Sequence, residues 1–269
     1  MEMWKETPGL LGEIPETPIM GVTAEIPHLT YYPSRNKNSD AAVVIFPGGG
    51  YAFRADHEGK GYAEFLNLYG YDCFVCDYRV YPHHFPIPLL DARRAVRYVR
   101  YHADEYKINK NKIIVMGSSA GGSLASLVST YKEPIEYEGL DEIDNEDPIP
   151  NGQILCYPVI TIENDEITHE GSKNCLLGEE LRGIAKTISP ENNVVPTTPK
   201  AFIWHTAEDD CVSVMNSYMY AGALKSAGVP TEMHIFPYGG HGMGVATWDP
   251  YICRWTSLLL EWLKLEFGK

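Results

Sequence analysis

Basic residues are scarce in this chain. Its 269 residues include 22 Lys and Arg against 36 Asp and Glu, which gives a formal net charge of −14. Nucleic-acid binders neutralise phosphates with clustered Lys and Arg, so this balance argues against DNA or RNA as a partner. Hydrophobic residues make up 44% of the chain, which is enough for a large core, so disorder is not expected.

Long apolar runs are also missing. No uninterrupted apolar stretch approaches the roughly 20 residues that a helix needs to cross a bilayer. The first residues, Met-Glu-Met-Trp-Lys-Glu-Thr-Pro, lack the basic start and the apolar stretch of a secretory signal. We therefore expect a cytoplasmic protein with no membrane partner. A monomer and a homodimer are both compatible with these features.

Clustered cysteines are absent as well. The six cysteines lie far apart, and a chain of this length can fold without disulfides. Cys73 and Cys76 have a redox-type spacing, but their apolar surroundings predict a buried strand rather than a helix start, where thiolates are stabilised. We expect reduced thiols, no metal site and no organic cofactor.

What the chain has instead is a regular alternation of short apolar runs with longer amphipathic segments from residue 41 onward. Such alternation is typical of an α/β protein whose mostly parallel sheet carries helices on both faces. Strands are predicted at 41–46, 73–78, 112–116, 153–157, 200–205 and 231–236, and helices at 59–69, 89–106, 120–131, 214–227 and 251–267.

Two stretches interrupt this pattern, and we interpret residues 1–269 as one domain with two insertions. Residues 133–147 contain eight acidic residues and no basic one, which predicts a mobile surface loop. Residues 158–199 form an unusually long connection, which we interpret as a small cap over the functional site. The four arginines at positions 93, 94, 97 and 100 are predicted to form a solvated helix face.

Ser119 is the candidate nucleophile. It lies at the centre of Gly117-Ser-Ser-Ala-Gly-Gly122, between a predicted strand and a predicted helix. This G-x-S-x-G pattern is the nucleophile elbow, a strained turn that presents a serine hydroxyl at the end of a sheet. A Gly-Ser turn without chemistry is the alternative, and the strand–turn–helix context favours the elbow.

His241 is the candidate base, because a serine nucleophile needs a partner that accepts its proton. It lies in the glycine-rich loop 238–244, directly after the last predicted strand. Three other histidines follow Ser119 in the chain. His205 and His234 lie inside predicted strands and are interpreted as core or edge residues, and His169 lies in the predicted cap.

The residue that orients the base is predicted among three neighbouring acids, Glu208, Asp209 and Asp210, which follow the strand at 200–205. The distance from the strand end favours Asp209, with Asp210 second and Glu208 third. A buried carboxylate is needed to accept the imidazole N–H and to set its tautomer.

Backbone amides of Gly49, Gly50 and Ala120 are the candidate oxyanion donors. Pro47-Gly-Gly-Gly-Tyr51 follows the first strong strand, where such a loop is required. A phosphate-binding loop is the competing interpretation. It fails because Phe53 stands where a dinucleotide fingerprint has its third glycine, and because no Gly-Lys-Ser or Gly-Lys-Thr follows.

With these motifs, and with Asp77-Tyr-Arg79, His205-Thr-Ala-Glu-Asp209 and Gly240-His-Gly242, the chain resembles the α/β-hydrolase superfamily. Within it, the chain is similar to small esterases related to hormone-sensitive lipase and to acetyl xylan esterases. The resemblance implies an α/β-hydrolase fold, with Ser119, His241 and Asp209 as catalytic triad and with no cofactor or metal. Ser123 and Ser213 depart from the pattern, since the acetyl-esterase branch often has His and Pro there.

The resemblance implies a serine ester hydrolase that acts on small-molecule esters with short, acetyl-like acyl groups. The short cap and the absence of a long apolar stripe favour small acyl groups. The resemblance implies acetylated sugars or xylo-oligosaccharides as substrates. A peptidase, a formamidase and a lactonase of the same fold stay open as alternatives, as does a non-catalytic binding protein.

Overall fold

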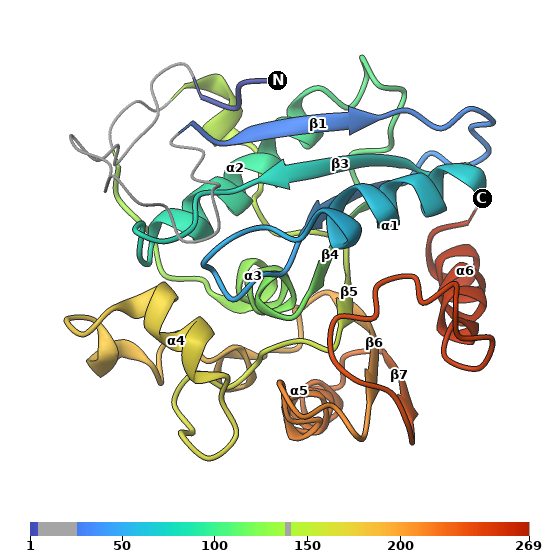
Figure 1. Ribbon diagram of the computed structural model, residues 1–269. Coiled ribbons are helices and arrows are strands. Elements are labelled where there is room, and N and C mark those ends of the chain that lie inside the picture. The colour runs from blue at the N-terminus through green and yellow to red at the C-terminus, as the bar shows by residue number, and fades with distance from the viewer. Residues whose placement is uncertain (5–25, 138–140, 269) are drawn as a thin grey trace.

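The computed structural model describes residues 1–4, 26–137 and 141–268 (Figure 1). Their strands form one seven-stranded sheet in the order β1-β3-β2-β4-β5-β6-β7. All neighbouring strands are parallel except β1, which pairs antiparallel with β3 at the edge. The strands are β1 His28–Tyr32, β2 Ala42–Phe46, β3 Asp72–Asp77, β4 Ile113–Ser118, β5 Gly152–Cys156, β6 Lys200–Thr206 and β7 Thr231–Phe236.

Helices cover both faces of the sheet, as the alternating pattern predicts. Side chains alternate between the two faces along each strand. In β2, Val44 belongs to the apolar cluster of α2, α3 and α5, whereas Val43 belongs to the cluster of α1 and α6. Figure 1 shows α1 and α6 on one side of the sheet and α2 and α3 on the other. The helices are α1 Asp56–Leu68, α2 Ile87–Tyr101, α3 Ala120–Thr130, α4 Glu170–Leu177, α5 Met215–Ser226 and α6 Arg254–Phe267.

The predicted elements differ from the observed ones mainly at two places. The edge strand β1 was not predicted, because only Leu29 of its five residues is fully buried and no clear alternation marks it. Helix α2 ends at Tyr101 rather than at residue 106. The helical hydrogen bonds give way to turns there, since the Ala103 amide donates to the Arg100 carbonyl, only three residues back.

The predicted solvated arginine face on α2 is wrong. The Arg94 side chain is only 1% exposed, and its guanidinium donates to Asp141 Oδ1 and Oδ2 at 2.7 Å and to Asp144 Oδ2 at 2.9 Å. A buried guanidinium is tolerated where carboxylates satisfy its donors, and here the acidic insertion supplies them. Hence the described part of residues 133–147 packs against α2, and the predicted mobility of this loop stays a prediction.

Two further α2 arginines bind backbone carbonyls at the two ends of the same insertion. Arg93 donates to the carbonyls of Tyr131 and Glu133, and Arg100 donates to those of Asp147 and Ile149. The periodicity of α2 did not reveal this role, because the pattern treats every arginine as solvated. The carbonyl and carboxylate partners replace the water that a solvated guanidinium would bind.

The connection between β5 and β6 contains the predicted cap region, residues 158–199. It holds α4 and two short 3-10 helices, Arg182–Ile184 and Pro190–Asn193. Within the described ranges, no helix has the length and apolar character needed to cross a membrane.

Candidate active site

Ser119 lies between β4 and α3, in the backbone conformation of a strained elbow. Its φ is 53° and its ψ is −120°, and the residue is 5% exposed. Two glycines allow this turn to pack tightly. A Cβ on Gly121 would lie 2.0 Å from the carbonyl oxygen of Phe46, and one on Gly117 would lie 2.0 Å from that of Gly121. The glycines of the motif are therefore required by close backbone contact.

His241 lies in the loop after β7 and contacts Ser119 directly. Its Nε2 is 2.9 Å from Ser119 Oγ, and its Nδ1 is 2.7 Å from Asp209 Oδ2. An ionised carboxylate can only accept, so Nδ1 carries the ring proton and donates to Asp209. In the neutral ring, Nε2 is then free to accept the proton of the Ser119 hydroxyl.

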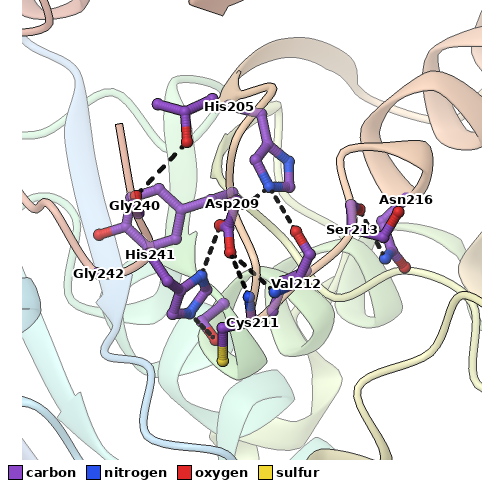
Figure 2. A network of polar contacts seen from close by, with 12 residues as sticks. His205, Asp209, Cys211, Val212, Ser213, Asn216, Gly240, His241 and Gly242 are labelled. Carbon is purple, nitrogen blue, oxygen red and sulfur yellow. Dashed lines mark hydrogen bonds and ion pairs between the residues drawn. The ribbon is translucent and has the colours of Figure 1, made fainter. Parts of the chain in front are cut away.

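Asp209 is buried and fully hydrogen-bonded (Figure 2). Its Oδ1 accepts the amide protons of Cys211 at 3.0 Å and Val212 at 2.8 Å, while Oδ2 faces His205 and His241. Burial alone would raise the pKa of this carboxyl, but the hydrogen bonds from His205, His241 and the Val212 amide outweigh it and hold the pKa well below its usual range. Asp209 is thus ionised at neutral pH.

The two competing acids, Glu208 and Asp210, are exposed. Neither contacts His241 in the structure, whereas Asp209 does. The structure therefore brings together Ser119, His241 and Asp209, the three residues that chain order and spacing favoured.

His205 is a partner of Asp209 that our reading of the sequence missed. It is fully buried near the end of β6, and its Nε2 lies 3.2 Å from Asp209 Oδ2 and 3.0 Å from the Val212 carbonyl oxygen (Figure 2). Both oxygens are acceptors, so Nε2 carries a proton and donates. His205 therefore holds the carboxylate in the orientation in which it meets His241.

His205→Phe is expected to lower kcat for ester hydrolysis by about tenfold to a hundredfold, with a much smaller effect on KM, because small misplacement of a catalytic group slows the chemical step. His205→Gln should recover part of kcat, since its amide can still donate to Asp209. Steady-state kinetics of both variants would measure this. Equal losses in the two variants, or a loss confined to KM, would contradict a positioning role.

The glycine loop after β2 lies beside Ser119. Gly49 and Gly50 have φ of 126° and 65°, and a Cβ on Gly49 would lie 2.3 Å from the Phe53 carbonyl oxygen. Within the part of the chain that the structure describes, the amides of Gly49, Gly50 and Ala120 have no hydrogen-bond acceptor. Unpartnered amides next to a nucleophile are what an oxyanion requires.

A buried network that our reading of the sequence also missed supports this loop. The carboxylate of Glu58 on α1 accepts the Gly48 amide at 2.9 Å and the Tyr157 hydroxyl at 2.7 Å. The Tyr157 hydroxyl in turn accepts the Gly244 amide at 2.9 Å, and its ring packs edge-on against His241. The network therefore ties the glycine loop to the loop that carries His241.

These residues surround a pocket of about 630 Å³. Gly49, Gly50, Ser119 and His241 line it, and His169 lines it from the cap. His169 Nδ1 accepts the Ser172 amide at 3.1 Å, and burial and the nearby His241 lower the pKa of His169. In the described ranges, His, Cys, Asp and Glu side chains nowhere form a group of three or more that could hold a metal ion.

The two cysteines with redox-type spacing are in surroundings that do not suit redox or metal chemistry. Cys73 and Cys76 are buried in β3, and burial raises the pKa of both thiols well above the usual value. A thiol with a raised pKa is a poor nucleophile and a poor ligand.

The fold and this geometry define an α/β-hydrolase with a serine, histidine and aspartate arranged as in serine hydrolases. The model of the BD-FAE family matches residues 30–224. The chain therefore belongs to the BD-FAE family, among the esterase-like α/β-hydrolases.

Similar proteins agree with this assignment. The acetyl ester-xyloside bifunctional hydrolase from Caldicellulosiruptor lactoaceticus is 40% identical with a TM-score of 0.88, over 100% of this chain and 96% of that one. Endo-1,4-beta-xylanase B of Butyrivibrio fibrisolvens is 36% identical over 86% of this chain, and the acetylxylan esterase of Xylanibacter ruminicola is 36% identical over 84%. This chain spans 37% and 46% of the length of those last two proteins.

Proposed function

We propose that the protein is a serine ester hydrolase that removes acetyl groups from xylan-derived saccharides. The observation that carries the proposal is the unbroken hydrogen-bonded chain from Ser119 through His241 to the ionised Asp209, at a pocket bordered by unpartnered amides. Relatives named for acetyl ester and xylan chemistry support the choice of substrate class.

In the proposed mechanism, Ser119 Oγ attacks the ester carbonyl while His241 Nε2 takes its proton. The amides of Gly49, Gly50 and Ala120 donate to the oxygen that becomes negative, and Asp209 stabilises the imidazolium. Collapse transfers the acyl group to Ser119, and His241 protonates the departing alcohol. Water activated by His241 then releases the carboxylic acid and restores the serine.

Similarity supports a short acyl group, because an acetyl ester-xyloside hydrolase and an acetylxylan esterase are among the similar proteins. The pocket of about 630 Å³ is lined on its cap side by His169, Gly171 and Cys175, and it has room for the acyl group together with part of the alcohol. If the protein acts in the cytoplasm, as we expect from its sequence, the substrates would be acetylated xylo-oligosaccharides that the cell has taken up.

A substrate panel tests this function. 4-Nitrophenyl esters from acetate to decanoate, assayed beside acetylated xylo-oligosaccharides, should give the highest kcat/KM for acetyl esters. A fluorophosphonate probe should label Ser119, as peptide mass spectrometry would show. A preference for chains of eight carbons or more would contradict the acetyl assignment. Faster turnover of formamides, lactones or peptides would assign the triad to another reaction, and absence of both labelling and turnover would point to a binding protein.

A further inference from the structure

A second hollow lies against the active-site pocket and has no role in the mechanism. It is a groove of about 780 Å³ that runs along α1, with Trp248 on its far side. His57 lines both the groove and the active-site pocket, so the two spaces share a wall.

One face of α1 forms the near wall. His57, Gly61, Glu64, Phe65 and Leu68 all line the groove, and their spacing of three to four residues places them on one side of the helix. These residues run from His57 to Leu68, so at 1.5 Å per residue this wall is about 17 Å long. A groove of that length can hold a short oligosaccharide.

Gly61 at the centre of this wall is not required by packing. A Cβ placed on it would meet no atom within 4 Å, and its backbone is helical. Glycine inside a helix costs about 1 kcal/mol relative to alanine. What the glycine does provide is an open floor halfway along the groove.

The opposite wall continues directly from the catalytic loop. His57 Nε2 lies 3.0 Å from the Gly242 carbonyl oxygen, which fixes the start of α1 against the loop that carries His241. A few residues later Trp248 borders the groove with 69% of its surface exposed, on a segment that Ala246 turns with φ of 54°. An exposed indole at this position gives the groove a flat apolar surface.

We propose that this groove binds the sugar chain that carries the ester. This inference rests on the proposed function, because an ester on an oligosaccharide held at Ser119 must leave the remaining sugar units outside the pocket. The groove offers the two kinds of contact that a pyranose needs. Trp248 and Phe65 give apolar surfaces for the C–H faces of the rings, and the exposed side chains of Arg35, Asn36 and Glu64 give partners for the hydroxyls.

The polar side chains favour a sugar over a long acyl chain. A hydrocarbon tail has no group that could hydrogen-bond to Arg35 or Glu64, which are exposed beside the groove. A saccharide can accept from the guanidinium and donate to the carboxylate instead.

Filling the groove from its floor tests the proposal. In Gly61→Phe the new side chain enters open space from a helical backbone, so the fold should be retained. The ratio of kcat/KM for acetylated xylo-oligosaccharides to kcat/KM for 4-nitrophenyl acetate is expected to fall about tenfold or more. Gly222→Phe is the matched control, because Gly222 is also helical, on α5, and also has no atom within 4 Å of a placed Cβ. It should leave the ratio unchanged.

Removal of the indole is the second variant. Trp248→Ala should lower the same ratio about tenfold, whereas Tyr218→Ala, which removes an exposed aromatic on α5, should not. Calorimetry with unacetylated xylo-oligosaccharides should show binding to Ser119→Ala protein that Gly61→Phe weakens.

The outcomes separate this inference from the proposed function. If both groove variants keep the unmodified ratio of kcat/KM values and turn over both substrates, the groove does not bind the sugar chain. The proposed esterase function would be unaffected by that result. Loss of activity on 4-nitrophenyl decanoate but not on acetylated oligosaccharides in Gly61→Phe would assign the groove to an acyl chain and overturn it as well. Absence of any turnover in the unmodified protein would overturn the proposed function itself. Calorimetric binding of xylo-oligosaccharides would then still test whether the groove binds a sugar chain.

Discussion

Ser119→Ala is expected to lower kcat for 4-nitrophenyl acetate by about 10⁴-fold or more and to abolish labelling by a fluorophosphonate. The substitution removes only the hydroxyl group, and without it His241 has no nucleophile to deprotonate. Loss of the nucleophile of a serine hydrolase leaves only the small rate that the oxyanion donors and substrate binding supply. Steady-state assays with a long time base would measure the residual rate.

The Ser119→Ala variant should fold normally, so a loss of activity would not result from misfolding. Ser119 holds its φ of 53° because the turn between β4 and α3 enforces it, and alanine meets the same strain as serine in that conformation. Circular dichroism and thermal unfolding should match the unmodified protein. Ser213→Ala, at a partly exposed site after Asp209, serves as a serine control. Turnover at the unmodified level in folded Ser119→Ala protein would refute the assignment of the nucleophile.

The alternation of strands and helices could be predicted from sequence, because buried strands leave recognisable apolar runs in it. Each parallel strand from β2 to β6 is covered on both faces, so nearly every residue is buried and each strand contains an apolar run that is easy to find. The edge strand β1 has no such run and was not predicted. It pairs with a strand of the sheet on one side only, a single bridge to Glu2 lies on the other side, and its residues are mixed in polarity.

The site residues differ in how far sequence could reach them. Ser119 and His241 stand in glycine-rich loops at the carboxyl ends of strands, so motif and chain order suffice to find them. His205 and Glu58 stand inside regular elements. Glu58 meets Tyr157, a residue 99 positions later in the chain, and only the folded sheet brings them together. A buried acid on an amphipathic helix gives no sequence signal that distinguishes it from a solvated one.

The arginines of α2 are another case in which a contact between distant segments could not be predicted from sequence. Helical periodicity predicted a solvated face, because arginine is nearly always exposed. The acidic insertion lies some 47 residues after Arg94 in the chain, so the contact could not be inferred from either segment alone. Charge of opposite sign on two separate segments was the available signal, and we read both as surface.

Asp209→Asn is expected to lower kcat at neutral pH by about 10⁴-fold, whereas Asp210→Asn should stay within a factor of about two. The backbone amides of Cys211 and Val212 donate to Oδ1, so the carbonyl oxygen of the new asparagine will remain with them. Its amide nitrogen then occupies the place of Oδ2 and turns two N–H bonds toward His241 and His205. Both histidines were donors at that point.

This reversal of donors is what makes the loss large. To avoid two donors facing each other, His241 must move its proton to Nε2, and the nitrogen that should accept from Ser119 then presents a hydrogen instead. Asp210 is exposed and does not contact His241, so the same change there alters only surface charge. Stopped assays of both variants at pH 7, with fluorophosphonate labelling rates beside them, give the comparison. A larger loss in Asp210→Asn would transfer the orienting role to Asp210 and contradict the hydrogen-bond pattern around His241.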